Sequence, residues 1–192
     1  MRRITMSKQI LFVSGHTHMR DSLANKTILN DMKAMYPQAT FDYLTESYPD
    51  FAFDVTKEQA KLKVADIIVI EYPMFWFNAP SIVQRWFEEV FLHGFAYGTG
   101  GDKLQGKTMI VSLTSGAPEE VYTADAAGTP GIESYLLPMK ATAAYTGMKW
   151  GGFIYSGGMM SIGVDEATKQ ALTDKAKDHA KRLHALIASV LG

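Results

Sequence analysis

The chain has 192 residues, enough for one substantial hydrophobic core but too few for two comfortable domains. Hydrophobic residues make up 47% of the chain, charged residues 20%, and the net charge is −1. No basic stripe is visible, which argues against a nucleic-acid partner. There is no cysteine, and this excludes disulfides, cysteine nucleophiles and cysteine-ligated iron–sulfur clusters.

The amino terminus lacks the apolar stretch of a signal peptide, and no segment approaches the length of a membrane span. We therefore expect a cytoplasmic protein. Met6 is an alternative start of the chain. We accordingly expect residues 1–6 to be an N-terminal extension and residues 7–192 to form a single domain.

Five apolar, strand-like runs alternate with segments of helical periodicity. The predicted strands are residues 9–14, 41–44, 67–72, 108–113 and 150–155. The predicted helices are residues 22–35, 56–65, 80–92, 132–145 and 165–191. Pro138 inside the fourth helix predicts a kink or a late start, and Asp165 is the expected N-cap of the last helix.

Strands that alternate with helices indicate a parallel sheet with helices on both faces, an α/β fold. Five strands at this spacing suit a flavodoxin-like, doubly wound sheet of order 2-1-3-4-5. In such a sheet the ligand site lies at the carboxyl ends of strands one and three. We therefore expect function in the loops that follow the strands.

The first of these loops, residues 14–25, opens a helix, where unpaired N–H groups and the helix dipole attract anions. Ser22 and Asn25 add side-chain donors suited to a phosphate. The loop matches neither the Walker pattern nor Gly-x-Gly-x-x-Gly. The alternative is that Ser22 is only a helix cap and that His16 and His18 are solvated. A metal site is disfavoured, because no third ligand lies at a suitable spacing.

The second loop, residues 73–80, is aromatic although loops usually carry polar turn residues. Large rings held between two prolines suggest a rigid wall for a flat ligand. The alternative is a loop packed under neighbouring chain or against a second subunit. The third loop, residues 114–118, is small and hydroxylated, so its backbone can approach a ligand closely or simply form a turn.

The order and spacing of several motifs resemble the flavin-dependent NAD(P)H:quinone oxidoreductases of flavodoxin-like fold, over nearly the whole chain. The branch with the ancillary flavoproteins of glutathione-regulated potassium efflux is the most similar. The motifs are His16 with Ser22–Asn25, Pro73–Phe77, Trp86–Phe91, Gly94–Gly98, Leu104–Lys107 and Thr114–Gly116, together with Tyr48–Phe51.

The resemblance implies a role for each loop. The flavin phosphate would be held by His16, Ser22, Leu23, Ala24 and Asn25. The isoalloxazine ring would lie on Met74, Phe75, Trp76 and Phe77, whose backbone N–H groups would face its heteroatoms. Its pyrimidine edge would be held by Thr114, Ser115, Gly116 and Ala117, where donors stabilise the charge of the reduced ring. Tyr122 would line the nicotinamide and quinone pocket as a catalytic residue, and Phe95 is a second candidate near that pocket.

The chain departs from the pattern of many relatives at two places. Gly116-Ala117 stands where many have two glycines, and residues 126–131 lack the histidine that often follows the tyrosine. The departure puts the proton or charge relay in doubt. Hydride transfer itself requires only stacking and orientation.

We therefore expect a flavin-dependent NAD(P)H:quinone oxidoreductase that uses a ping-pong scheme. FMN is favoured over FAD because loop one is short, while the choice between NADH and NADPH and the natural acceptor stay open. Apolar surface at the aromatic loop and at residues 95–97 predicts a homodimer whose pockets the partner chain completes. The alternatives are a regulatory subunit docked on a potassium-efflux transporter and an electron-carrier flavodoxin, against which the weak net charge argues.

Overall fold

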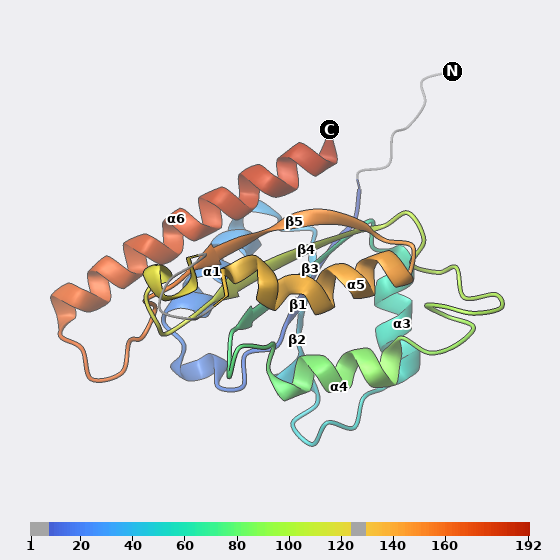
Figure 1. The fold of residues 1–192 in the computed structure, drawn as a ribbon, viewed down its shortest axis with the longest axis horizontal. Coiled ribbons are helices and arrows are strands. Elements are labelled where there is room, and N and C mark those ends of the chain that lie inside the picture. The colour runs from blue at the N-terminus through green and yellow to red at the C-terminus, as the bar shows by residue number, and fades with distance from the viewer. Residues whose placement is uncertain (1–7, 124–129) are drawn as a thin grey trace.

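The computed structural model describes residues 8–123 and 130–192. Its centre is a five-stranded parallel sheet of order β2-β1-β3-β4-β5, which confirms the predicted order (Figure 1). The strands are β1 (Ile10–Ser14), β2 (Thr40–Tyr43), β3 (Ile67–Pro73), β4 (Thr108–Thr114) and β5 (Lys149–Ser156). Every residue of β3 and β4 is buried, as expected for central strands covered on both faces.

Helices cover both faces of the sheet (Figure 1). Helices α1 (Ala24–Met35) and α6 (Glu166–Leu191) pack on one face, and their apolar residues form one core cluster with that side of the sheet. Helices α3 (Val55–Val64), α4 (Ser81–Val90) and α5 (Leu137–Tyr145) form the second cluster on the other face. A single turn, α2 (Leu44–Ser47), follows β2.

Local signals explain where the long helices start. Asp165 caps α6, because its side chain accepts a hydrogen bond from the Thr168 amide at 2.7 Å, as predicted. The helix predicted at 132–145 starts late at Leu137, since Pro138 is tolerated only in a first turn. The 3₁₀ turn Ile132–Leu136 precedes it, and two further 3₁₀ turns cover Met19–Asp21 and Glu119–Tyr122.

The expectation of exposed apolar surface at residues 95–97 is wrong for its first two residues. Phe95 and Ala96 are 5% and 1% exposed and belong to the core, so this segment adds little apolar surface for a dimer. Phe95 does not line the cavity described below, so its predicted place near the ring pocket stays a prediction. The predicted extension at 1–6 and most of the stretch without a histidine, residues 126–129, lie outside the described residues. The domain boundary therefore stays a prediction.

Candidate functional site

A cavity of about 320 Å³ lies at the carboxyl ends of β1, β3, β4 and β5. Four loops meet there, as the parallel sheet requires of segments that follow its strands. Predicted residues that line it are His16, Ser22, Leu23, Ala24, Asn25, Met74, Phe75, Thr114, Ser115 and Gly116. Its other walls are His18, Asp21, Pro73, Met159, Met160, Ser161 and Ile162.

Loop one presents donors that the described chain does not use. The Ser22 hydroxyl oxygen accepts hydrogen bonds from the Asn25 amide at 3.1 Å and the Asn25 side chain at 3.3 Å. Both bonds are accepted at oxygen, so the hydroxyl proton stays available. The amides of Leu23 and Ala24 have no acceptor among the described residues, as expected at a helix start. The helix cap proposed as the alternative therefore exists and still leaves donors for an anion.

His16 faces the same cavity as a neutral ring. Its Nδ1 accepts the His18 amide at 3.0 Å, which places the remaining proton on Nε2. Burial, reinforced by the nearby His18, lowers the pKa of His16 to about 4. Nε2–H is thus a donor across the physiological range, and it adds no charge.

Asn25 ties loop one to loop three. Its side chain is buried, and its Oδ1 accepts the Thr114 hydroxyl at 3.0 Å. The same side chain donates to Ser22, so one of its two amide protons remains for a ligand. Asn25 therefore has a structural role beyond the ligand contact predicted for it.

Loop two turns back on itself at two aromatic residues. Phe75 and Asn78 exchange backbone hydrogen bonds of 2.9 and 3.1 Å around Trp76 and Phe77. Trp76 and Phe77 have φ of 49° and 65°, left-handed values that cost a non-glycine residue about 1 kcal/mol or more. The expectation that all four amides of residues 74–77 face a ligand needs correction: Met74 donates to the Thr114 carbonyl and Phe75 to Asn78.

Aromatic rings pack beside this turn. Phe77 stacks on Tyr135 with centroids 5.5 Å apart and meets the edge of Tyr122 at 6.5 Å. Tyr122 is buried and is also perpendicular to Tyr155 at 6.0 Å. Trp76 is 92% exposed. Trp76, Phe77, Ala117 and Tyr122 do not line the cavity itself, so their predicted contacts with a ligand stay predictions.

A fourth wall, residues 157–162, was missed from the sequence. It follows β5 and runs along loop three, where Met159 donates to the Ser115 carbonyl at 2.8 Å and Gly158 to the Ala117 carbonyl at 2.6 Å. Met160 leaves little room at Gly116, because a Cβ there would lie 2.9 Å from its terminal methyl. Ligands bind at the carboxyl ends of parallel strands, and this applies to the segment after β5 as it does to the other loops. Gly157-Gly158, directly after the strand, was the available signal in the sequence.

Glu71, the fifth residue of β3, is a carboxyl group buried beneath this edge of the sheet. The Ser14 hydroxyl donates to its Oε2 at 2.8 Å, while Oε1 is buried with no partner among the described residues. Burial raises the pKa of Glu71 to about 8, and the Ser14 hydrogen bond opposes this only in part. The group is therefore a neutral acid near pH 7.

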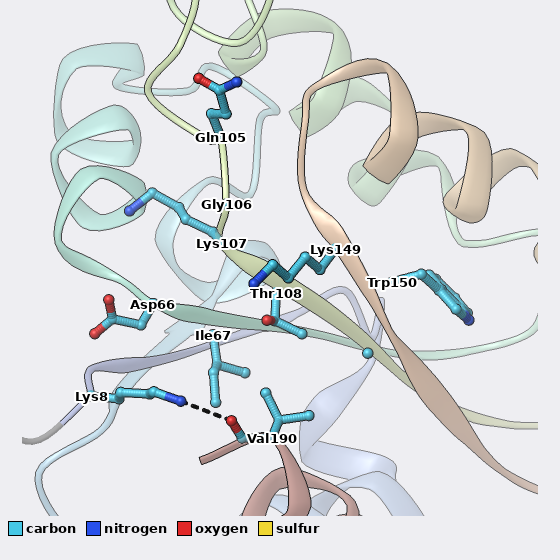
Figure 2. Close-up of a pocket in the computed structure, with 11 residues that line it drawn as sticks. Lys8, Asp66, Ile67, Gln105, Gly106, Lys107, Thr108, Lys149, Trp150 and Val190 are labelled. Carbon is cyan, nitrogen blue, oxygen red and sulfur yellow. Dashed lines mark hydrogen bonds between the residues drawn. The ribbon is translucent and has the colours of Figure 1, made fainter. Parts of the chain in front are cut away.

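A second polar cavity, of about 530 Å³, lies at the opposite edge, where the strands begin (Figure 2). Lys8, Lys107 and Lys149 surround it in Figure 2. Lys107 donates to the carbonyls of Lys63 and Ala65 at 2.8 and 2.5 Å, which caps the end of α3. Lys8 caps the end of α6 in the same way through Val190 and Leu191 at 2.8 and 3.0 Å.

Residues 8–123 and 130–192 lack two further kinds of feature. No group of three or more His, Asp or Glu side chains is placed to hold a metal ion. No helix in those ranges is both long and apolar enough to cross a membrane.

Comparisons with known proteins agree with this geometry. The family model described as "Flavodoxin-like fold" matches residues 8–183. The glutathione-regulated potassium-efflux system ancillary protein KefF of Enterobacter sp. (strain 638) is 38% identical over 141 residues, which are 73% of this chain and 78% of that protein. The uncharacterized NAD(P)H oxidoreductase YrkL of Bacillus subtilis (strain 168) is 32% identical over 174 residues, 91% of this chain and 98% of that one.

A solved structure is similar as well. The general stress protein 14 of Treponema denticola, crystallised in complex with FMN, superposes with a TM-score of 0.81 at 27% identity. The match covers 93% of this chain and 99% of that protein. The resemblance inferred from the sequence motifs is thereby confirmed at the level of the family.

Proposed function

Because the chain belongs to the family with the flavodoxin-like fold, we propose that it is an FMN-dependent oxidoreductase that takes electrons from NAD(P)H and reduces quinones or similar acceptors. One observation carries the proposal. The cavity at the carboxyl edge presents donors of Ser22, Leu23, Ala24 and His16 that the described chain leaves unused. A phosphate group is the ligand that such a set of neutral donors at a helix start suits best.

The cavity residues fit FMN in their chemistry. Loop one would hold the phosphate, and Met74, Phe75 and the fourth wall at Met160 would supply apolar contacts for the ring. Gly116 and Ala117, whose amides have no acceptor within the described ranges, would face its pyrimidine edge. The bound flavin supplies the chemistry, since it carries a pair of electrons from donor to acceptor.

The chain's own contribution is orientation and exclusion of water. Thr114 and Asn25 join two loops at 3.0 Å, and the left-handed turn at Trp76 and Phe77 is held by the Phe75–Asn78 pair, so the walls are preorganised. Tyr122 would contact the nicotinamide or the acceptor next to this wall. Donor and acceptor would use one face of the ring in turn, which gives a ping-pong scheme.

FMN is proposed rather than FAD because loop one is short, and the FMN complex of the Treponema denticola protein supports this choice. The name of the Bacillus subtilis relative, an NAD(P)H oxidoreductase, supports the electron donor. Quinone as acceptor rests on the motif resemblance. A homodimer is proposed because Trp76 is 92% exposed and Phe75 and Phe77 are about half exposed beside it.

One experiment tests the central claim. The protein is purified, its flavin is released with acid and identified by mass, and quinone reduction is assayed with NADH and with NADPH. We expect FMN in a stoichiometry near one per chain and quinone-dependent oxidation of one nicotinamide. A chain that neither carries nor binds added FMN or FAD would contradict the proposal, and FAD alone would correct the cofactor.

A second candidate function follows from the 38% identity to KefF, an ancillary protein of a potassium-efflux system. In that case the chain would dock on a membrane transporter as a regulatory flavoprotein, with or without turnover of its own. Co-purification with a tagged potassium-efflux transporter, compared with a Trp76→Ser variant, would test such docking. Loss of flavin in that variant would point to the cofactor wall instead of a docking surface.

A further inference from the structure

We propose that Tyr155, at the carboxyl end of β5, is a positioning residue that fixes the cofactor loop Thr114–Ala117 through the Ser115 hydroxyl. The proposal rests on the proposed function, because it gives Tyr155 a role at the same flavin site. Tyr155 was not singled out from the sequence, and it does not line the cavity. It would act on the ligand only through loop three.

The direction of the hydrogen bonds assigns the donor. The oxygens of Tyr155 and Ser115 lie 2.7 Å apart, and the Ser115 hydroxyl also lies 2.8 Å from the Ala117 carbonyl. A carbonyl can only accept, so Ser115 donates its single proton to Ala117. Tyr155 must therefore donate to Ser115. The result is a directed chain, Tyr155 to Ser115 to Ala117, that spans the loop.

The surroundings of Tyr155 hold the donor in place. Its ring meets Tyr122 edge to face at 6.0 Å and packs against the core cluster on the α3–α5 side. Burial raises the pKa of Tyr155 to about 12, so the hydroxyl keeps its proton at any physiological pH. Gly157 leaves space for it, since a Cβ there would lie 2.6 Å from the phenolic oxygen.

The loop itself gains its shape from these contacts. Ser115 donates its amide to the Ser156 carbonyl at 3.0 Å, and the Ala117 carbonyl also accepts the Gly158 amide at 2.6 Å. With Ala117 fixed from both sides, the amides of Gly116 and Ala117 keep one direction. Neither has an acceptor in the described part of the chain. Preorganised donors of this kind stabilise negative charge on a bound ring without reorganisation.

The first arm of the test uses the protein without flavin. Hydrogen–deuterium exchange is measured on peptides that span residues 114–118 in the wild type and in Tyr155→Phe. The variant keeps the ring and removes only the donor, so we expect faster exchange confined to this loop. Tyr36→Phe is the matched control, because its hydroxyl bonds to His184 far along the chain from this loop.

The second arm uses the FMN-loaded protein and measures affinity and midpoint potential. Loss of one neutral hydrogen bond predicts roughly a threefold to tenfold lower affinity for oxidised FMN in Tyr155→Phe. The reduced, more negative ring depends more on the two amides, so we expect its affinity to fall about tenfold further. That difference corresponds to a midpoint potential about 30 mV more negative for a two-electron couple.

A double-mutant cycle decides whether Tyr155 acts through Ser115. Ser115→Ala removes the acceptor of Tyr155 and the donor to Ala117, so Tyr155→Phe should change neither affinity nor potential in that background. Additive effects, or wild-type exchange and potential in Tyr155→Phe, would overturn the proposal. Absence of any flavin binding by the wild type would instead reject the proposed function, while the exchange arm would still report on Tyr155.

Discussion

The two edges of the sheet both carry a cavity, and the cavities differ in how many of their hydrogen-bond donors already have an acceptor within the described residues. At the amino edge the ammonium group of Lys8 donates to the Val190 carbonyl near the end of α6 (Figure 2). The ammonium group of Lys107 donates to the Ala65 carbonyl that follows α3. Asp66 at the same edge accepts the Gln9 amide at 2.8 Å. These charges complete the backbone at helix and strand ends.

At the carboxyl edge the situation is reversed. Ser22 accepts two hydrogen bonds and keeps its proton, His16 keeps Nε2–H, and the Leu23 and Ala24 amides have no acceptor within residues 8–123 and 130–192. Lys8 and Lys107 at the larger cavity thus have structural roles, whereas the smaller cavity, which has Asp21 as its one carboxylate wall residue, keeps unused donors for a ligand. A group of unused donors at a helix start, not cavity volume, marks the carboxyl edge as the candidate site.

The largest expected effect is on the free energy of unfolding and comes from Glu71. This buried carboxyl group at the carboxyl edge has one hydrogen bond and one oxygen without a partner among the described residues. Its pKa of about 8 in the folded protein exceeds the ordinary value of 4.5, so the folded state holds a proton that the unfolded state has released between these pH values. The stability from this group is complete below pH 4.5 and is lost as the pH rises to 8. The slope is about 1.4 kcal/mol per pH unit.

Glu71→Gln removes this dependence. Chemical unfolding at pH 5, 6, 7 and 8 should show a stability difference from wild type that grows in favour of the variant, by up to about 3 kcal/mol at pH 7. Glu120→Gln, at an exposed carboxyl, is the control, and its free energy of unfolding should change with pH in parallel with that of the wild type. If the free energy of unfolding changes with pH equally in wild type and Glu71→Gln, Glu71 is not a buried neutral acid.

A substitution at Ser22 tests directly whether the unused donors of loop one bind the FMN phosphate. Ser22→Ala removes a hydroxyl proposed to donate to a charged phosphate, which should weaken FMN binding by about 10- to 100-fold, or roughly 1.5–3 kcal/mol. The affinity is measured by fluorescence titration of the protein without flavin. Ser22→Ala also removes the helix cap, at a cost of about 1 kcal/mol in unfolding.

Two further variants separate the cap from the donor. Ser22→Asp keeps a cap acceptor but places a negative charge toward the phosphate, so it should stay stable and bind even less FMN. Asp165→Ala removes the cap of α6 and should lower stability while leaving FMN affinity unchanged. Tight binding by Ser22→Asp would show that no phosphate lies at loop one.

The fold was predictable because its signals are local. The buried runs of β3 and β4, the helical periodicity and the Asp165 cap each lie within one short stretch. The strand order then followed from the alternation of strands and helices. The loop proposed for the phosphate was predicted in the same way, since Ser22 and Asn25 lie at the start of a helix that follows a strand.

The details that were missed depend on residues far apart in sequence. The bond between Asn25 and Thr114 joins residues 89 apart, and that between Ser115 and Tyr155 joins residues 40 apart. Likewise, the sequence does not show that the amides of Met74 and Phe75 already donate hydrogen bonds to the carbonyls of Thr114 and Asn78. Sequence patterns identify which residues have suitable chemistry, whereas only packing determines which of their groups remain unpaired.

Tyr122 extends the comparison from cofactor binding to catalysis. Its ring is fixed by Phe77, Tyr135 and Tyr155, while its hydroxyl has no hydrogen-bond partner within the described ranges. Tyr122→Phe should slow turnover by 10- to 100-fold if it donates one hydrogen bond in the transition state, about 1.4–2.7 kcal/mol. FMN content should not change.

Stopped-flow measurement of both half-reactions checks this prediction. Reduction by NAD(P)H, reoxidation by quinone, or both should be slower in Tyr122→Phe than in Tyr145→Phe, whose tyrosine is 73% exposed on α5. If neither half-reaction slows, Tyr122 serves only as packing for Phe77.

The smallest effect is expected at the amino edge, where a matched pair of lysines is available. Lys107→Met keeps the apolar stem but leaves the Lys63 and Ala65 carbonyls without their donor, which should cost about 1 kcal/mol of unfolding free energy. Lys149→Met, at an exposed lysine whose ammonium group has no hydrogen-bond partner in the described ranges, should change stability by less than about 0.5 kcal/mol. FMN affinity should match wild type in both variants, because neither ammonium group lines the cavity at the carboxyl edge. Denaturant unfolding and FMN titration measure the two quantities. Weaker FMN binding in either lysine variant would show that the amino edge of the sheet also contributes to FMN binding, which contradicts its assignment as purely structural.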